Sequence, residues 1–168
     1  MDIRVIPPTE AFQQCYNAYI TELGDEERYP MPMDLNHDDF PALIERLNGY
    51  SDGIGLPDGL VPNSTFWLIC NDTLAGVANL RHYLTPALQH AGGHIGLGIR
   101  PGYRGRGLGT LLLAYTVEKA RSMNIRPVHI HCHQHNLASV GMITACGGKL
   151  HSEEDWQKQK ISRYIINN

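Results

Sequence analysis

The stretch that decides the fold is RGRGLGT, residues 104–110, in which every second residue is a glycine. It follows a short strand-like run, Gly93–Ile99, and opens a strongly helical segment, Leu108–Met123. Such a turn is an anion site, because the first N–H groups of a helix lack internal partners and the helix dipole favours negative charge. Glycines let a phosphate approach these amides, and arginines add planar donors. We therefore interpret the stretch as a pyrophosphate-binding turn, whose contacts would be Arg104, Gly105, Arg106, Gly107, Leu108, Gly109 and Thr110.

Three kinds of phosphate site compete for this interpretation. A Walker A loop ends in Gly-Lys-Ser/Thr, and the turn contains no lysine. The dinucleotide fingerprint requires G-x-G-x-x-G and an acidic residue about 20 positions later. The glycines here run G-x-G-x-G, and the next strand-like run, Val128–His133, holds no acidic residue. An acyl-CoA site is the third kind, and it fits the residues best.

The turn resembles the Gln/Arg-x-x-Gly-x-Gly/Ala signature of the GNAT superfamily of N-acetyltransferases, through Arg104, Gly107 and Gly109. Further segments look like one uncharacterised bacterial branch of that superfamily: Asn79–His82, Gly92–Gly96, Ile99–Pro101, Asn136, Ser139, Gly147–Gly148 and Arg163–Ile166. The resemblance covers residues 60–168 well and the N-terminal third loosely. It implies a single domain over residues 1–168 with an α/β (α+β) fold. The central sheet would be mixed, mostly antiparallel, splayed into a V and flanked by helices.

The resemblance also implies a reaction. Acetyl-CoA would be the co-substrate, with its pantetheine arm in the V-shaped gap on the free backbone groups of Leu97 and Ile99. Asn136 and Ser139 would contact the cofactor, although Asn136 could equally cap a helix. The acetyl group would pass directly to a primary amine of a small molecule, amino acid or peptide. Direct transfer is favoured because no cysteine lies in a nucleophile motif.

The sequence identifies the catalytic groups less clearly than the cofactor-binding residues. Many relatives supply a glutamate from the central strand as base, but no acidic residue lies between Leu74 and Pro101. We expect His94 to act as the base, directly or through a water, with a packed structural histidine as the alternative. Relatives often place a tyrosine, which protonates the leaving sulfur, seven residues after the asparagine that corresponds to Asn136. This chain has Ile143 at that position. Ser139, a water or a histidine would then protonate the sulfur, or the thiolate would leave unaided.

Substrate recognition is expected at the end of the hairpin strand. Arg81 and His82 could meet a carboxylate or phosphate of the acceptor there, and a surface salt bridge explains Arg81 as well.

Two other classes of function remain open. The alternating residues His129, His131, His133 and His135 would share one side of a strand, so a metal-binding protein is geometrically conceivable. The strand offers no carboxylate on that side, and we expect no metal. The second alternative is a non-catalytic acyl-CoA sensor, which the missing glutamate and tyrosine would favour.

Composition narrows the partners. The chain has 168 residues and a formal net charge of −3, which gives no electrostatic reason to expect nucleic acid or an anionic membrane as partner. No apolar run approaches the ~20 residues that span a bilayer, and the N-terminus does not resemble a signal peptide. The four cysteines lack metal-type spacing, so we expect free thiols in a cytoplasmic protein. A homodimer is the assembly we would expect first, since dimers are the commonest oligomers.

Periodicity and turn residues predict the other elements. The N-terminal part should contain a strand at 3–6, helices at 9–23 and 36–48, and a long loop at 49–64 that we interpret as part of the acceptor-site rim. The remainder should contain a hairpin at 65–70 and 74–83, a strand at 126–133, a helix at 136–146 and strands at 149–151 and 162–166.

Overall fold

The computed structural model describes residues 1–167, and its first sheet is antiparallel with its strands in sequence order. The strands are β1 (Ile3–Ile6), β2 (Asn63–Cys70), β3 (Thr73–Arg81) and β4 (Ile95–Ile99). The β2–β3 hairpin turns at Asn71 and Asp72, which take positive φ angles of 48° and 63°. Asn and Asp tolerate this left-handed conformation better than most residues, so the predicted turn forms where the sequence indicates.

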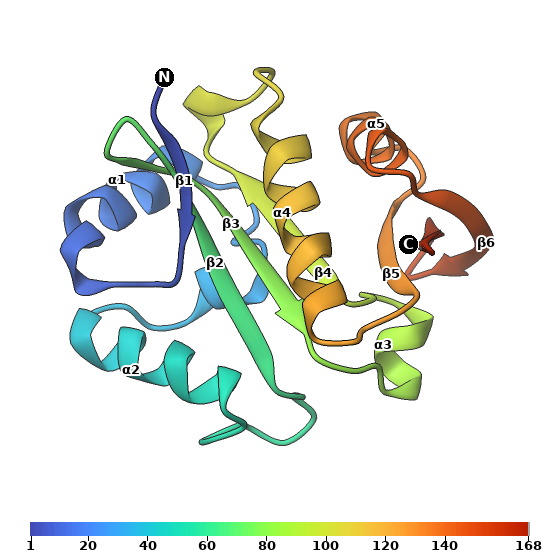
Figure 1. The fold of residues 1–168 in the computed structure, drawn as a ribbon, viewed down its shortest axis with the longest axis horizontal. Helices are drawn as coiled ribbons and strands as arrows, with labels where there is room; N and C mark the ends of the chain where they lie inside the picture. Colours follow the sequence, from blue (N-terminus) through green and yellow to red (C-terminus); the bar gives the residue numbers. More distant parts are fainter. Residues whose placement is uncertain (168) are drawn as a thin grey trace.

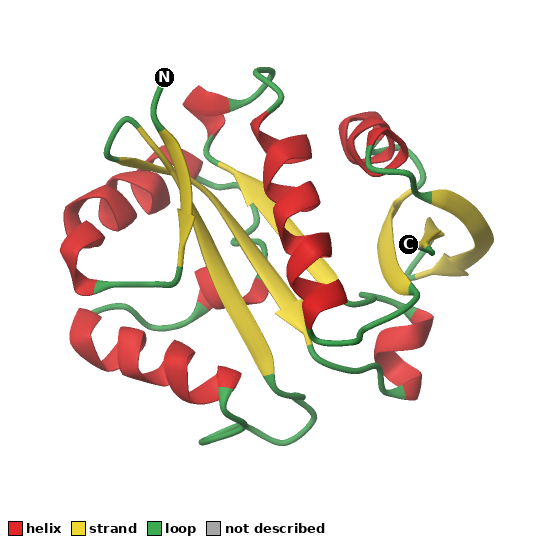
Figure 2. Cartoon of the chain, viewed as in Figure 1, coloured by secondary structure: helices red, strands yellow, loops and turns green. Residues whose placement is uncertain are grey.

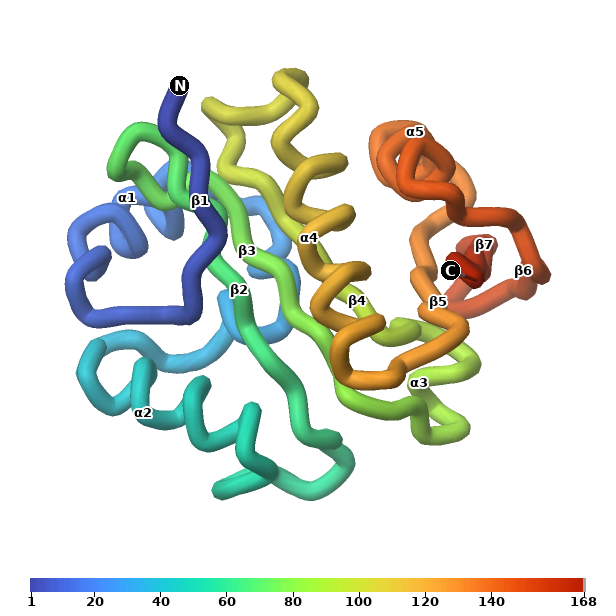
Figure 3. Tube along the Cα trace, viewed as in Figure 1, coloured from blue at the N-terminus to red at the C-terminus, as the bar shows by residue number. Residues whose placement is uncertain are grey.

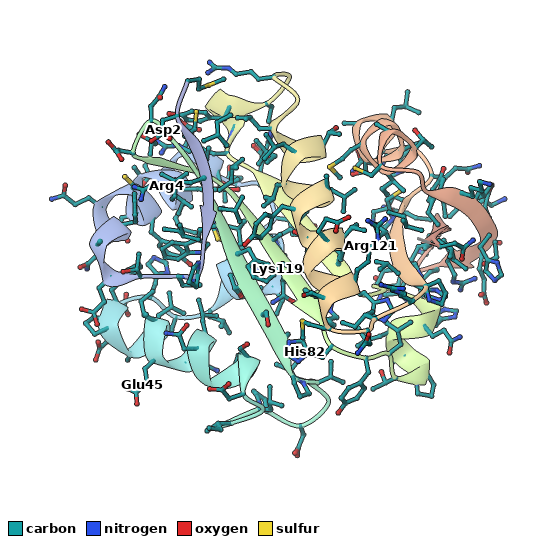
Figure 4. All side chains as sticks on the ribbon, viewed as in Figure 1. Asp2, Arg4, Glu45, His82, Lys119 and Arg121 are labelled. Atoms are coloured by element: carbon teal, nitrogen blue, oxygen red, sulfur yellow. The ribbon has the colours of Figure 1, made fainter. Side chains whose placement is uncertain are left out.

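Helices cover both faces of this sheet (Figure 1). The helices α1 (Gln13–Leu23) and α2 (Phe40–Ser51) pack on one face, around a core that includes Tyr16, Phe40 and Trp67. The helix α4 (Leu108–Ser122) covers the other face through Leu108 and Leu112. Figure 4 shows Lys119 and Arg121 near the C-terminal end of α4, where they complement the negative end of the helix dipole.

A second antiparallel sheet has the strand order β5–β7–β6. Its elements are β5 (Val128–His133), β6 (Lys149–Trp156) and β7 (Gln159–Ile166), and the helix α5 (Leu137–Ala145) connects β5 to β6. The hairpin β6–β7 is much longer than predicted. Its turn consists of Gln157 and Lys158 with φ angles of 49° and 66°. Neither residue is typical of a left-handed turn, so the sequence carried no signal for it.

The two sheets meet at one point. An isolated bridge joins Gly93 to Ile130, and the two strands β4 and β5 are otherwise edge strands of separate sheets. In Figure 2 the strands accordingly fall into two groups, and the trace in Figure 3 follows the crossover from β4 through α4 to β5. The edges of β4 and β5 therefore diverge from this meeting point as a V.

Short helices complete the chain: η1 (Glu10–Phe12), η2 (Met31–Asp34), α3 (Pro86–His90) and η3 (Pro101–Tyr103). Sequence analysis missed α3, which Thr85 caps by accepting the N–H of Leu88. The second helix begins four residues later than predicted, because Asp39 provides the cap by accepting the N–H of Ala42.

Candidate active site

A cavity of about 900 Å³ opens between the diverging strands. Its turn end is formed by the glycine-rich turn and the start of α5: Arg104, Gly105, Gly107–Thr110 and Asn136–Ser139. Its closed end is formed where the sheets approach each other: Tyr29, Ala91, Gly92 and His131. Glu27 also lines the cavity. Between the two ends, Leu97–Ile99 of β4 face Cys132 and His133 of β5. Most of the residues predicted to bind the cofactor are thus brought together on one surface.

The turn end presents unpaired backbone N–H groups. Gly105 and Gly107 have φ angles of +77° and +76°, a conformation that other residues rarely adopt. Gly107 is the N-cap of α4 and supplies no side-chain cap. The helical hydrogen-bond ladder begins with the N–H of Leu111 bonded to the carbonyl of Gly107, 3.2 Å away. The N–H groups of the first three residues, Leu108–Thr110, therefore have no partner within α4 and are free to bind an anion.

The two arginines of the turn differ in position. Arg104 lines the cavity, donates from Nε to the carbonyl of Ile99 at 2.9 Å, and forms an ion pair through Nη2 with Glu26, also at 2.9 Å. Arg106 lies outside the lining, with its guanidinium over the ring of Tyr103, 5.3 Å from the ring centroid. The geometry supports Arg104 as a phosphate ligand and does not support Arg106.

The open edge of β4 offers the backbone groups that the sequence analysis required. The backbone N–H of Arg81 donates to the carbonyl of His94, and the backbone N–H of Arg100 donates to the carbonyl of Ala75. Because hydrogen-bonded pairs alternate along an antiparallel ladder, residues 94, 96, 98 and 100 bond to β3, while Leu97 and Ile99 point their N–H and C=O groups into the gap. The carbonyl of Ile99 is already taken by Arg104.

A segment that sequence analysis did not single out lies across β4. A Cβ atom on Gly98 would lie 2.5 Å from the carbonyl oxygen of Tyr29, and one on Gly96 would lie 3.0 Å from the Tyr29 hydroxyl. Burial raises the pKa of this hydroxyl. The alternating glycines of β4 were the available signal, since they indicate that another backbone approaches closely. The predicted rim at residues 49–64 does not line the cavity, whose lining on this side comes from residues 26–29.

Asn136 and Ser139 begin α5 beside the turn. The side chain of Asn136 caps the helix by accepting the N–H of Ser139 at 3.1 Å, and both residues line the cavity. Capping and cofactor contact are therefore compatible for Asn136, because the cap itself holds it at the cavity wall.

His94, the expected base, lies outside the cavity lining. It is 6% exposed, and its Nδ1 accepts the backbone N–H of His129 at 2.9 Å. The backbone N–H of His94 donates to the backbone carbonyl of His129 at 2.7 Å. Burial, with smaller effects of His129 and Arg81, lowers its pKa to about 4. This geometry does not support a base; it supports the alternative, a histidine that fastens the two sheets together.

Arg81 and His82 also lie outside the lining. Arg81 donates from Nη1 to the carbonyls of Gly92 and Gly93, at 3.1 and 2.9 Å. His82 is hydrogen-bonded through Nε2 to Ser64, at 2.8 Å, and lies at the end of the β2–β3 hairpin (Figure 4). Both side chains are thus occupied by the protein itself, and the geometry gives them no substrate contact.

The four alternating histidines from His129 to His135, here called the histidine ladder, lie in different surroundings. His131 and His133 line the cavity, whereas His135 lies beyond the end of β5 and stacks on His133, with ring centroids 5.5 Å apart. The prediction that all four histidines share one strand is therefore wrong for His135. Among residues 1–167, no group of three or more His, Cys, Asp or Glu side chains is arranged to hold a metal ion.

Residues 12–147 match the acetyltransferase (GNAT) family. Similar solved structures include the ribosomal-protein-S5-alanine acetyltransferase of Vibrio fischeri (12% identity, TM-score 0.74, covering 100% of this chain and 94% of that one). Another is a putative acetyltransferase of Salmonella typhimurium with its cofactor acetyl-CoA (12%, TM-score 0.64, 98% and 93%). A third is the dodecameric spermidine N-acetyltransferase of Vibrio cholerae (14%, TM-score 0.66, 98% and 93%). No curated protein matches significantly.

These similarities confirm the predicted fold, with helices flanking antiparallel strands. Within the described part of the chain, no helix has the length and apolar character needed to cross a membrane.

Proposed function

Because the chain belongs to the GNAT acetyltransferase family, we propose that it transfers an acetyl group from acetyl-CoA directly to a primary amine of a small molecule, amino acid or peptide. One observation carries the proposal. A single cavity joins three free N–H groups at the start of α4 to the open edge of β4, and continues to side chains at the closed end. This arrangement suits a long ligand with an anionic part at one end and a reactive group at the other.

The backbone would hold acetyl-CoA. The pyrophosphate would lie on the N–H groups of Leu108–Thr110, with Arg104 as the charged partner. The pantetheine arm would lie along β4 and bond to Leu97, whose backbone groups face the gap. Asn136 and Ser139 would flank the arm from α5. The thioester would then reach the closed end, where Tyr29 and His131 lie.

The amine must lose a proton before it attacks, since a free alkylamine has a pKa near 10. Glu27 lines the cavity and forms no ion pair with any other described residue. We propose that its carboxylate attracts the incoming ammonium group and receives its proton, directly or through water. This role replaces the missing glutamate of the central strand with a carboxylate from the segment after α1.

Direct transfer remains the preferred route even though one cysteine lines the cavity. Burial raises the pKa of the Cys132 thiol, so this group stays protonated at neutral pH. A thiol is a poor nucleophile compared with a thiolate. An acetyl-cysteine intermediate is therefore not proposed, and Cys132→Ser should retain turnover.

The acyl-CoA sensor remains the second candidate. It is favoured by β4, Ile95–Ile99, which carries no titratable side chain, and by Ile143 at the position where relatives place a tyrosine. A cytoplasmic location, a single domain and a homodimer also remain predictions.

Release of CoA thiol from acetyl-CoA tests the proposal. The assay would use a panel of amines, amino acids, polyamines and short peptides, with the background from the protein's own cysteines subtracted. Release that depends on one class of amine is the expected result and would identify the acceptor class. Absence of release with every acceptor, while acetyl-CoA still raises the melting temperature, would favour the sensor.

A further inference from the structure

His131 is a buried side chain without a hydrogen-bond partner. It lies on β5, is 8% exposed, and lines the closed end of the cavity. Neither ring nitrogen has a partner among the described residues. The ring lies against the bridge between the sheets, since a Cβ atom on Gly93 would be 3.2 Å from its Cδ2. A buried polar group without a partner destabilises the fold, so a group of this kind in a cavity wall indicates a missing ligand.

The surroundings keep this imidazole uncharged. Burial lowers its pKa to about 4, with further contributions from Arg163, His129, Arg81 and His94. Above that pH the ring has one N–H and one nitrogen lone pair, and both are available for hydrogen bonding. The two arginines also disfavour a second cation beside the ring. The position therefore suits a neutral ligand group that can donate a hydrogen bond.

We propose that His131 holds the acceptor amine in its uncharged form, with one ring nitrogen accepting an N–H of the amine next to the thioester. This inference rests on the proposed function. The amine loses its ammonium proton to Glu27 or water before it reaches His131. Its nitrogen then forms a bond to the thioester carbonyl carbon, the carbon–sulfur bond breaks, and one of the two N–H protons of the amine passes to sulfur while the other stays on the amide nitrogen. The products are an N-acetylated amine and free CoA.

His131 differs from its neighbours because both of its ring nitrogens are buried without a partner, whereas His133 has one such nitrogen, Nδ1. His94 has almost the same burial, but its Nδ1 is bonded to the His129 amide and it does not face the cavity. His133 faces the cavity, but its ring stacks on His135 and it is only partly buried. Only His131 among these three combines burial, exposure to the cavity and two unpaired nitrogens.

The test compares His131→Leu with His131→Gln, using the amine identified by thiol release. In His131→Leu we expect kcat/KM for the amine to fall by about 10- to 100-fold, because one hydrogen bond to the substrate is lost. CoA affinity should not change. The glutamine carboxamide can accept the same N–H, so His131→Gln should recover most of kcat/KM. His129→Leu is the matched control on the same side of β5 and should retain kcat/KM, since His129 does not line the cavity.

Thermal stability separates this role from a structural one. His131→Leu should melt at the same or a higher temperature, since it removes an unpartnered polar group. His94→Leu should melt at a lower temperature. Unchanged kcat/KM in His131→Leu, or a loss of melting temperature as large as that of His94→Leu, would overturn the inference while leaving the proposed function intact. A wild-type protein that releases no CoA with any amine would overturn both.

Discussion

The two ends of the cavity are built in different ways. The anion-binding groups proposed at the turn end lie in one continuous stretch of chain, and they are backbone N–H groups made accessible by glycine. The closed end takes its groups from three separate segments: Tyr29, residues 91–92 and His131 of β5. Backbone groups can bind a ligand regardless of which side chains surround them, so the turn end suits a ligand that every relative shares. The closed end can change its chemistry one side chain at a time, which suits the choice of acceptor.

The largest effect is expected at the turn end, from Gly107→Asp. A side chain at this position would strain a residue with a φ of +76°, and its charge would oppose the pyrophosphate. We expect CoA affinity to fall by more than about 100-fold, measured by calorimetry or by the ligand-induced shift in melting temperature. Gly59→Asp is the matched control, since Gly59 has a φ of +87° and lies outside the cavity lining. Equal affinity in the two variants would contradict the phosphate assignment.

The closed end should respond through stability when His94 is changed. His94→Leu removes the side-chain hydrogen bond to the His129 amide, at the only bridge between the two sheets in the described chain. We expect the free energy of unfolding to fall by roughly 1–3 kcal/mol, measured by urea denaturation. CoA affinity at the turn end should change less than twofold. A stable variant that has lost turnover would instead return His94 to the role of base.

The same buried histidines predict a dependence of stability on pH. Burial lowers the pKa of His94 and of His131 to about 4, from a usual value near 6.5. Below pH 6.5 the unfolded chain therefore binds protons that the folded chain does not, and the free energy of unfolding should fall as the pH drops from 6.5 to 4. Urea midpoints at pH 7 and pH 4.5 would measure this loss. His131→Leu should lose less stability between these two pH values than the wild type does. An equal loss in both proteins would show that protonation of His131 does not cause it.

The glycine-rich turn and the helix start after it could be predicted from the sequence, because the residues that form them follow one another along the chain. Pyrophosphate binding at this turn stays a prediction. Gly105, Gly107 and Gly109 indicate a turn and a helix start whatever the rest of the fold does. The closed end depends on which segments meet. The glycines of β4 indicate that another backbone approaches, but no local pattern identifies it as that of Tyr29 or shows that His94 bonds to His129. The histidine ladder was visible in the sequence, but only the meeting of the two sheets singles out His131.

Glu27→Gln tests whether the cavity recognises a cationic acceptor. Loss of the carboxylate should raise KM for the amine by about 3- to 10-fold, the range expected for one partly exposed charge. The CoA affinity should remain unchanged, because the ion-pair partner of Arg104 is Glu26 and not Glu27. Asp25→Gln is a suitable control, since Asp25 is exposed nearby and does not line the cavity. Equal KM values for wild type and Glu27→Gln would exclude this carboxylate from acceptor binding.

The smallest expected effect concerns the ion pair between Arg104 of the turn and Glu26 of the segment after α1. Arg104 is paired with Glu26 at 2.9 Å, so a phosphate must compete with this carboxylate for the guanidinium. Both side chains are 48% exposed, which limits such a pair to roughly 1 kcal/mol or less. Glu26→Gln should therefore tighten CoA binding by about two- to fivefold, while Glu118→Gln, which breaks a pair with Arg121 on α4, should have no effect. Weaker binding in Glu26→Gln would mean that the pair holds Arg104 in place for the phosphate, and the two ends would then cooperate instead of competing.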